Sequence, residues 1–301
     1  MNRYAAAVLG GGFCWGFMGF FTRHLAKYGI DSDGAIVVRC AVAAVCFGLL
    51  MLLTDPGKFK IKIKDIWCFL GSGLLSLLFF TFCYFRAIDM MSLSSAAILL
   101  YIAPTVVMLL SAVLFREKIT KLKIIALILA FAGCALVSGV AGGMTVTGKG
   151  LLFGIGSGVG YALYTIFSRY SLERGYSSLT INFYSCLLAA VGAAVIWNPS
   201  PVMDVIKSST LPEGQTLPAW TWCIMIGVFS CFIPYLLYTY GLTGLENGKA
   251  SVLASVEPVV ASLVGILYYH EEMTPASALG VILVLSAVLL LNCRFAKHEK
   301  T

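Results

Sequence analysis

Long apolar runs dominate this chain, and they are apolar on all sides rather than along one helical face. A run of about 20 such residues is long enough for an α-helix to cross the hydrocarbon core of a bilayer. The runs lack the period-two alternation of a membrane β-barrel. The pattern therefore predicts an all-α polytopic membrane protein. Ten transmembrane helices are expected, at 4–26, 33–53, 66–87, 93–115, 121–140, 149–170, 179–198, 218–241, 246–268 and 274–294.

The second half of the chain repeats features of the first. Residues 96–120 align with residues 250–274 at a shift of 154, and residues 10–29 align with residues 156–175 at a shift of 146. The matched positions include Gly10 and Gly156, Gly12 and Gly158, Trp15 and Tyr161, Gly29 and Gly175, Pro104 and Pro258, Glu117 and Glu271, and Thr120 and Thr274. We interpret the chain as two homologous halves.

Each half holds five predicted helices, so the two halves enter the membrane in opposite directions. We expect two inverted five-helix repeats, residues 1–145 and 146–301. Inverted repeats are the architecture of many alternating-access transporters, in which the substrate site lies near the midplane between the repeats. This pattern is the main argument from the residues for transport.

The basic residues predict how the chain is oriented. The sequence has 21 Lys and Arg residues against 14 Asp and Glu residues, a formal net charge of +7. With the N-terminus in the cytoplasm, fifteen basic residues fall on the cytoplasmic side, five fall outside and Arg39 lies within a span. Basic residues are enriched in cytoplasmic loops. We therefore expect both termini in the cytoplasm, in a cell inner membrane, and the basic excess requires no nucleic-acid partner.

The composition gives no indication of an enzyme, a metal site or a cofactor. Apolar residues make up 59% of the chain and charged residues 12%, against about 25% charged in soluble domains. The ten cysteines form no C-x-x-C pair and are interpreted as small apolar fillers. His270-Glu271-Glu272 lies at a predicted helix end without spaced partners, so we interpret it as a cap. With no ATP-hydrolysing module in the sequence, pumping would draw on ion gradients.

Glu257 is the strongest candidate for a functional residue. It lies in the middle of an apolar run, and Pro258 follows it directly. A charge at that depth is costly and normally faces a bundle interior or a watery cavity. The proline also leaves a carbonyl near residue 254 without its usual donor. We expect Glu257 to bind a cationic or zwitterionic substrate or to carry a coupled proton, and we expect Pro104 and Pro258 to act as hinges. A purely structural carboxylate is the alternative.

Arg39 is a second charged candidate, because it lies about six residues inside a predicted helix. If its side chain faces inward, it binds a substrate carboxylate or pairs with Glu257. If it extends toward Asp31 or Asp33, its position needs no function. Both readings stay open at the level of sequence.

Aromatic and hydroxyl residues in the middle of predicted spans form a third group of candidates. Cavities for small organic molecules are mostly apolar with a few such groups, although packing explains the same residues. The substrate-binding candidates besides Glu257 and Arg39 are Trp15, Tyr101, Tyr161, Tyr235, Tyr238 and Ser255, the last being the repeat mate of Tyr101.

The chain resembles the EamA-type branch of the drug/metabolite transporter superfamily. The features that carry the resemblance are two five-helix halves, the glycine-rich first helix of each half, the E-x-x-T elements at Glu117–Thr120 and 271–274, and the Glu257-Pro258 pair. The resemblance implies a secondary carrier of small metabolites, often an exporter of amino acids or related compounds. It also implies a central cavity lined by the first, third, fourth, sixth, eighth and ninth helices.

We therefore expect a secondary active transporter of an amino acid, an amine or a related compound. Export is favoured, and proton coupling through Glu257 is a hypothesis. A uniporter, or an importer of a cationic or zwitterionic metabolite such as choline, is an alternative within the transporter class. A membrane-embedded lipid-handling or interaction protein is an alternative from another class. The expected partners are a small-molecule substrate, the lipid bilayer and protons, and the protein is expected to be a monomer or a homodimer.

Overall fold

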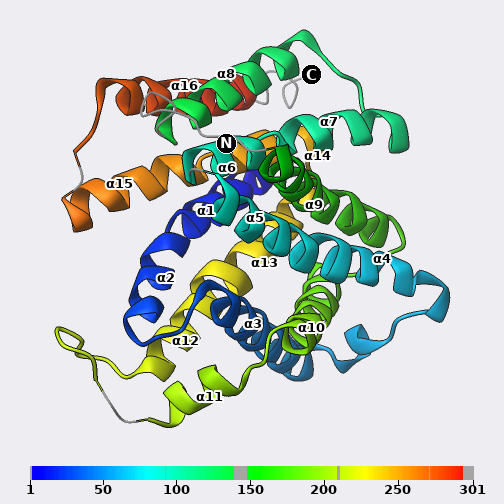
Figure 1. Ribbon diagram of the computed structural model, residues 1–301. Helices are drawn as coiled ribbons and strands as arrows, with labels where there is room; N and C mark the ends of the chain where they lie inside the picture. The colour runs from blue at the N-terminus through cyan, green and yellow to red at the C-terminus, as the bar shows by residue number, and fades with distance from the viewer. Residues whose placement is uncertain (1, 92, 139–147, 209–210, 271, 294–301) are drawn as a thin grey trace.

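The computed structural model describes residues 2–91, 93–138, 148–208, 211–270 and 272–293, and within these ranges the chain is helical apart from short connections (Figure 1). Eight segments are long and apolar enough to cross a membrane. They are Arg3–Lys27, Ser32–Thr54, Ile63–Ala87, Ser95–Leu114, Gly148–Glu173, Ser178–Ile196, Ala219–Leu242 and Asn247–Tyr269. The predicted class, an all-α polytopic membrane protein, is confirmed.

Several of these segments consist of more than one helix. The first contains α1 (Arg3–Gly16) and α2 (Met18–Lys27), which meet at Phe17. Two π-helical stretches, Gly71–Leu78 and Val228–Phe232, lie inside the third and seventh segments. The other helices of the eight segments are α3 (Ser32–Thr54), α4 (Ile66–Leu70), α5 (Phe79–Met90), α6 (Leu93–Leu100), α7 (Ala103–Leu114), α9 (Gly148–Glu173), α10 (Ser178–Ile196), α12 (Ala219–Gly227), α13 (Ile233–Leu242), α14 (Asn247–Ala254) and α15 (Glu257–Tyr269).

Two further apolar helices, α8 (Lys121–Val137) and α16 (Pro275–Cys293), pack side by side at the top of the view in Figure 1. Their contact is close because Gly133 and Gly280 face each other. A Cβ atom on Gly133 would lie 2.7 Å from the Gly280 carbonyl oxygen, and one on Gly280 would lie 2.6 Å from the Gly133 carbonyl oxygen. Small residues of this kind let membrane helices approach closely.

The spans that contain Pro104 and Pro258 are both broken, and at equivalent positions. The first break separates α6 from α7, and the second separates α14 from α15. At both breaks the backbone tightens to i→i+3 hydrogen bonds, from Ile102 to Leu99 at 3.3 Å and from Val256 to Leu253 at 3.4 Å. A proline in the first turn of the following helix cannot donate to the preceding turn. The continuous helices predicted over 93–115 and 246–268 are therefore each two shorter helices.

The turns that end the helices also match in pairs. Arg116 and His270, which lie 154 residues apart, are the two described residues other than glycine with positive φ, at 55° and 57°. Gly29 and Gly175, which lie 146 residues apart, have φ of 80° and 84°. A left-handed residue after a helix satisfies its last carbonyl groups. These pairs have the same separations as the two sequence alignments.

Side-chain caps define where several helices begin. Thr120 accepts a hydrogen bond from the Lys123 amide at 3.3 Å, and Thr274 accepts one from the Ser277 amide at 3.1 Å. The cap of α3 is Asp31, whose side chain accepts a hydrogen bond from the Gly34 amide at 2.8 Å. A short helix that the pattern did not predict, α11 (Ser200–Lys207), lies in the connection before α12.

Helix packing sets the place of the site. Helix α3 packs along α10, α1 along α13, and α5 along α9. In addition, α9 contacts α6 and α7, while α1 contacts α14 and α15. The broken spans thus lie against α1 and α9, the glycine-rich first helices of the two predicted halves. This arrangement surrounds a central space with side chains from both halves.

Candidate functional site

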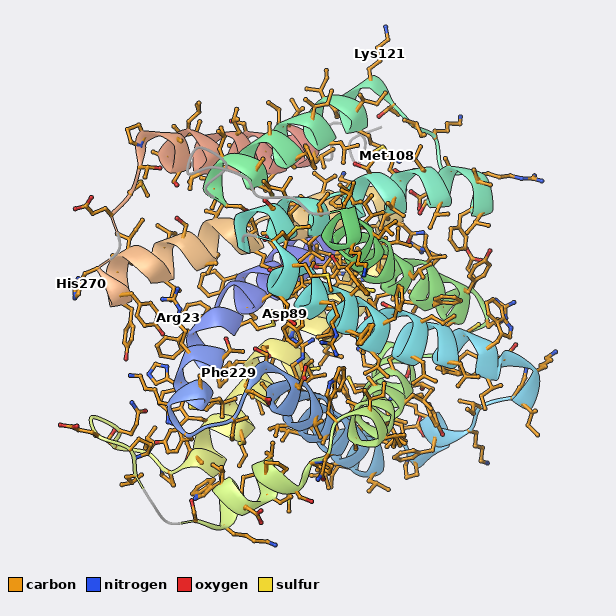
Figure 2. All side chains as sticks on the ribbon, in the orientation of Figure 1. Arg23, Asp89, Met108, Lys121, Phe229 and His270 are labelled. Atoms are coloured by element: carbon orange, nitrogen blue, oxygen red, sulfur yellow. The ribbon has the colours of Figure 1, made fainter. Side chains whose placement is uncertain are left out.

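A cavity of about 590 Å³ lies between the helices of the two predicted halves. Its rim includes Arg23, Ser32 and Glu272, which are exposed and lie where α2 ends and where α3 and α16 begin. In Figure 2, Arg23 and His270 lie on this side of the molecule, and Lys121 lies toward the other end of the bundle. The cavity is therefore open at one end of the bundle.

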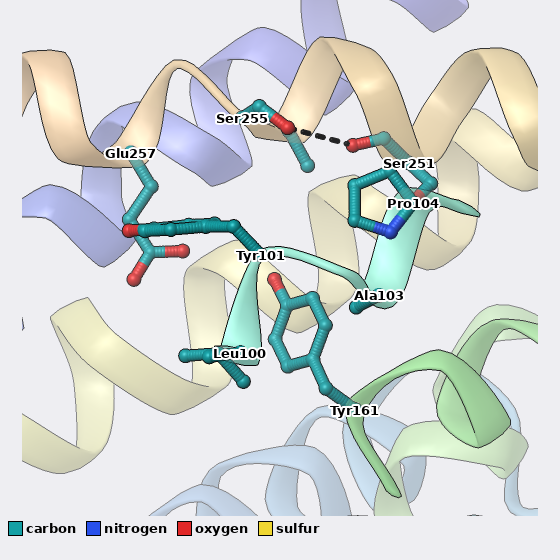
Figure 3. Close-up of a pocket in the computed structure, with 9 residues that line it drawn as sticks. Leu100, Tyr101, Ala103, Pro104, Tyr161, Ser251, Ser255 and Glu257 are labelled. Carbon is teal, nitrogen blue, oxygen red and sulfur yellow. Dashed lines mark hydrogen bonds between the residues drawn. The ribbon is translucent and has the colours of Figure 1, made fainter. Parts of the chain in front are cut away.

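Glu257 lies deep in this cavity, as the first residue of α15. Figure 3 shows its carboxylate beside the ring of Tyr101, with Ser255 and Ser251 on the adjoining turn. Within the described part of the chain, no hydrogen bond or ion pair engages the carboxylate. The break before α15 positions Glu257, because its backbone leaves the line of α14 there and the side chain turns into the open space.

Arg39 lines the same cavity from α3. Only 6% of its surface is exposed, and its Nη1 atom donates to the thioether sulfur of Met18 at 2.8 Å. Its Nε atom is buried and has no hydrogen-bond partner. Among the described residues it forms no ion pair, with Asp31 and Asp33 or elsewhere. The inward-facing alternative for Arg39 is therefore the one that the structure contains.

An aromatic cluster closes the cavity at its inner end. The ring of Trp15 lies 5.2 Å from Tyr235, 5.5 Å from Tyr238 and 6.3 Å from Tyr161, measured between ring centroids. The Tyr238 hydroxyl is 2.7 Å from Thr165 Oγ1. These rings pack against one another in the interior of the bundle, and the Tyr238 hydroxyl is engaged by Thr165.

Asn182 forms hydrogen bonds with residues in and next to this cluster. It accepts hydrogen bonds from the Tyr164 hydroxyl and from Thr239 at 3.1 Å, and it donates to the Tyr235 carbonyl at 3.2 Å. A fully buried amide with partners on three sides stabilises one arrangement of its neighbours. This residue therefore has a structural role.

A polar network closes the bundle at the end opposite the cavity mouth. The Glu117 carboxylate accepts hydrogen bonds from the backbone amides of Asn247 at 2.7 Å and Gly248 at 3.3 Å, which form the first turn of α14. Lys123 lies 3.8 Å from Glu117 and 2.8 Å from Glu246. A carboxylate at a helix N-terminus is favourable because of the helix dipole. The segment after α7 is thereby attached to α14.

Arg169 extends this network to α9. Its Nε atom donates to the Asn247 side chain at 2.7 Å, and its Nη2 atom donates to the Leu245 carbonyl. Asn247 in turn donates to Ser111 at 3.1 Å. The network therefore joins α7, α9 and α14, three helices from both predicted halves. Glu271, the predicted mate of Glu117, lies outside the described residues.

Comparison with known proteins places the chain in a family. A model of the EamA-like transporter family matches residues 2–139 and again residues 148–293. The chain belongs to this family. It is 31% identical to an uncharacterised transporter of Archaeoglobus fulgidus over 69% of its own length and 70% of that protein. It is 24% identical to the uncharacterised transporter YxxF of Bacillus subtilis over 92% of its own length and 85% of that protein.

The fold is that of a solved crystal structure as well. The EamA-like chain superimposes on it with a TM-score of 0.79 at 17% identity, covering 98% of both chains. At that identity the likeness concerns the fold alone. The predicted membership of the drug/metabolite transporter superfamily is confirmed by the family match.

The predicted binding residues of this EamA-like chain divide into two groups. Glu257, Arg39, Trp15 and Tyr101 line the large cavity. The others line two spaces of about 10 Å³ each, too small for more than one water molecule. These others are Ser255, Tyr161, Tyr235 and Tyr238. The second group lies beneath the floor of the cavity, between it and the closed end.

The cavity also contains residues that the sequence did not single out. Thr81 and Tyr84, which lie three residues apart on α5, share one face toward it, and Thr22 and Ser262 add hydroxyl groups. The i, i+3 spacing of Thr81 and Tyr84 inside an apolar run was the available signal. The helices lining the cavity also differ from the expectation, because α3, α8 and α16 contribute and α9 reaches only the two small spaces.

Proposed function

We propose that this chain is a secondary transporter that moves a small metabolite across the cytoplasmic membrane by alternating access. The observation that carries the proposal is one cavity, open at one end of the bundle and closed at the other by the aromatic cluster and the Glu117 network. Glu257, without a partner in the described chain, lies at its floor. A binding site that reaches one side of a membrane at a time is the basis of carrier-type transport.

The proposal includes two inverted five-helix repeats, residues 1–145 and 146–301. Four observations support this division. The broken helices, the left-handed residues and the two stretches matched by the family model follow the same repeat. Helix packing follows it as well, since the α1 contacts with α14 and α15 correspond to the α9 contacts with α6 and α7.

The repeat gives a physical account of switching. At the closed end, α14 packs against α7, α8 and α9. The repeat mates of these contacts would join α6 to α15, α16 and α1, at the end where the cavity is open. Exchange of the first set for the second closes the mouth and opens the other end. Since the two sets are similar in kind, the two states are close in energy and a bound substrate can shift their populations.

The orientation follows from charge. Lys58, Lys60, Lys62 and Lys64 precede α4. They lie at the end of the bundle opposite the cavity mouth, which we assign to the cytoplasm. The cavity then faces outward. Export is the favoured direction on the resemblance to exporters, and uniport or import uses the same two states.

Proton coupling is proposed at Glu257, because a carboxylate without a partner is free to take up a proton from the open cavity. We expect transport driven by a pH gradient in the wild type and gradient-independent exchange in Glu257→Gln. Gradient-driven accumulation that persists in the variant would exclude this residue as the coupling site.

Alternating access can be tested without knowing the substrate. Spin labels at Asp89 and Leu267 report on the open end, and labels at Lys118 and Thr243 report on the closed end, since all four side chains are exposed. We expect each distance to have two populations in lipid bilayers, and the populations to change in opposite directions in Glu117→Gln. That substitution removes the charge that caps α14, worth about 0.3–2 kcal/mol, so the population ratio should change about two- to thirtyfold.

Glu213→Gln is the matched control, because Glu213 is exposed in the connection before α12. Single, unchanged distances at both ends in the wild type and in Glu117→Gln would contradict the proposal. They would favour a membrane protein that does not transport.

A further inference from the structure

Two opposite charges face one cavity, and neither has an ionic partner in the described chain. Arg39 comes from α3 and Glu257 from α15. The break between α1 and α2 lies between them. A Cβ atom on Gly16 would be 2.9 Å from the Glu257 carbonyl oxygen, and Met18, two residues later, accepts the hydrogen bond of Arg39. Both charged residues thus lie next to the turn from Gly16 to Met18, and both line the cavity beside it.

Arg39 has the properties of an anion site. A guanidinium presents a planar fork of donors that matches a carboxylate through two parallel hydrogen bonds. Here one nitrogen donates to a thioether, which is a weak acceptor, and the buried Nε atom has no partner. Burying a charge with such weak compensation is unfavourable. A carboxylate entering from the cavity would replace the Met18 contact and satisfy Nε as well.

Glu257 has the complementary properties. Its carboxylate accepts hydrogen bonds only, and the ring of Tyr101 lies beside it (Figure 3), while the rings of Trp15 and Tyr84 line the same cavity. Aromatic rings attract cations through their faces, and this is how ammonium groups are commonly recognised. A cation at Glu257 would therefore meet both an opposite charge and aromatic faces.

We propose that the cavity selects a zwitterion, with the substrate's carboxylate on Arg39 and its ammonium group on Glu257. This inference rests on the proposed function and names the class of substrate. A simple amine would leave Arg39 uncompensated, and a simple acid would leave Glu257 uncompensated. A site built for a polar group strongly rejects an analogue that lacks it, because its own buried group is then unpaired. Ile36, Phe85 and Ile266 add apolar side chains to the wall, which can accept a hydrocarbon side group of the substrate.

The ammonium group can be primary, as in an α-amino acid, or quaternary, as in a betaine. Two matched sets of probe compounds distinguish these two types of substrate. The first is phenylalanine, phenethylamine and 3-phenylpropanoate. The second is glycine betaine, choline and 3,3-dimethylbutanoate. In each set the second compound lacks the carboxylate and the third lacks the cation.

Apparent dissociation constants come from thermal-stability titrations of the purified full-length protein, since ligand binding to the folded state raises the melting temperature. We expect at least one zwitterion to bind about 30-fold or more tightly than its own amine and its own acid. In Arg39→Gln the preference over the amine should disappear, and in Glu257→Gln the preference over the acid should disappear. Arg39→Lys should keep part of the preference, because the charge remains and the fork is lost.

Arg86→Gln and Glu213→Gln are the controls, since both side chains are exposed and neither lines the cavity, and both variants should keep the wild-type preference. A variant that melts before titration is replaced by Arg39→Lys or Glu257→Asp, which keep the charge. The inference is overturned if an amine or acid binds as tightly as its zwitterion, if neither substitution changes the preference, or if neither zwitterion binds. The spin-label distances test the transport proposal without any ligand, so its failure would be seen separately.

Discussion

At the scale of single residues, the contact between α1 and α15 has no spare volume at Gly16. A Cβ atom there would lie 2.5 Å from Val260 Cβ and 2.9 Å from the Glu257 carbonyl oxygen. Gly16→Ala should therefore push α15 away and move Glu257, at a cost of about 1–3 kcal/mol from overpacking. We expect a lower melting temperature in detergent and weaker zwitterion binding.

Gly19→Ala is the matched control for this substitution. Gly19 lies on the next turn, in α2, and a Cβ atom there meets nothing within 4 Å. Alanine at an unstrained helical glycine stabilises the folded state by about 0.4–1 kcal/mol. Equal melting temperatures for the two variants would mean that the close packing at Gly16 does not position α15.

Single residues also set the limit of prediction from the sequence. Glu257 was identifiable because an isolated acid in an apolar run is costly wherever it points. For Arg39, the rotation of α3 and the path of its long side chain decide between snorkelling and the cavity, and neither is encoded locally. For Tyr235 and Tyr238, whether a ring lines a cavity or fills its floor depends on neighbours such as Trp15 and Asn182.

At the scale of helices, substitution of the prolines after the two breaks tests whether they act as hinges. Pro258 cannot donate to the Ala254 carbonyl, whose oxygen faces Gly12. Pro258→Ala restores a donor and should favour a continuous helix through 254–258, with a gain of up to about 3 kcal/mol in local helix stability. We expect a higher melting temperature. We also expect one of the two spin-label distance populations to predominate, because the straightened span resists bending.

Pro104→Ala at the repeat mate should act in the same direction. Pro275→Ala provides the control, since Pro275 begins α16 and a missing amide in the first turn costs little. If both spin-label distances in Pro258→Ala keep the two wild-type populations, the prolines mark helix starts and are not hinges.

The helices show which features periodicity can and cannot predict. The length of each apolar run located the spans, because a helix needs about 20 apolar residues to cross a bilayer. The breaks inside the spans were indicated only by Pro104 and Pro258, and their form came from the i→i+3 bonds that the structure adds. The interruption at Phe17 has no proline and no turn residue other than Gly16, so it depends on packing against α15. Helix α11 is too short to give a membrane signal.

At the scale of the whole molecule, the repeat is symmetric in its backbone and asymmetric in its chemistry. The breaks and left-handed turns are duplicated, but Ala103 stands where the other half has Glu257. Arg39 likewise comes from one half only. In the proposed cycle, two similar halves exchange one set of contacts for the other, while Arg39 and Glu257 provide one binding site. The matched positions of the breaks and turns follow the sequence alignment, whereas the presence of Arg39 and Glu257 in one cavity depends on how the helices pack.

The orientation of the molecule can be tested by labelling single cysteines in a cysteine-free background. Leu217 and Met273 are exposed near the cavity mouth, and Lys60 is exposed at the other end. With the basic end in the cytoplasm, a membrane-impermeant maleimide added to intact cells should label Leu217→Cys and Met273→Cys, and should label Lys60→Cys only after the membrane is opened. Labelling of Lys60→Cys in intact cells would reverse the orientation. The cavity would then face the cytoplasm, and the conformation described here would be the one that loads an exported substrate. If labelling gives the expected result, the outward-open conformation is instead the one that releases an exported substrate outside the cell. The Glu117 network then keeps the cytoplasmic end closed during release.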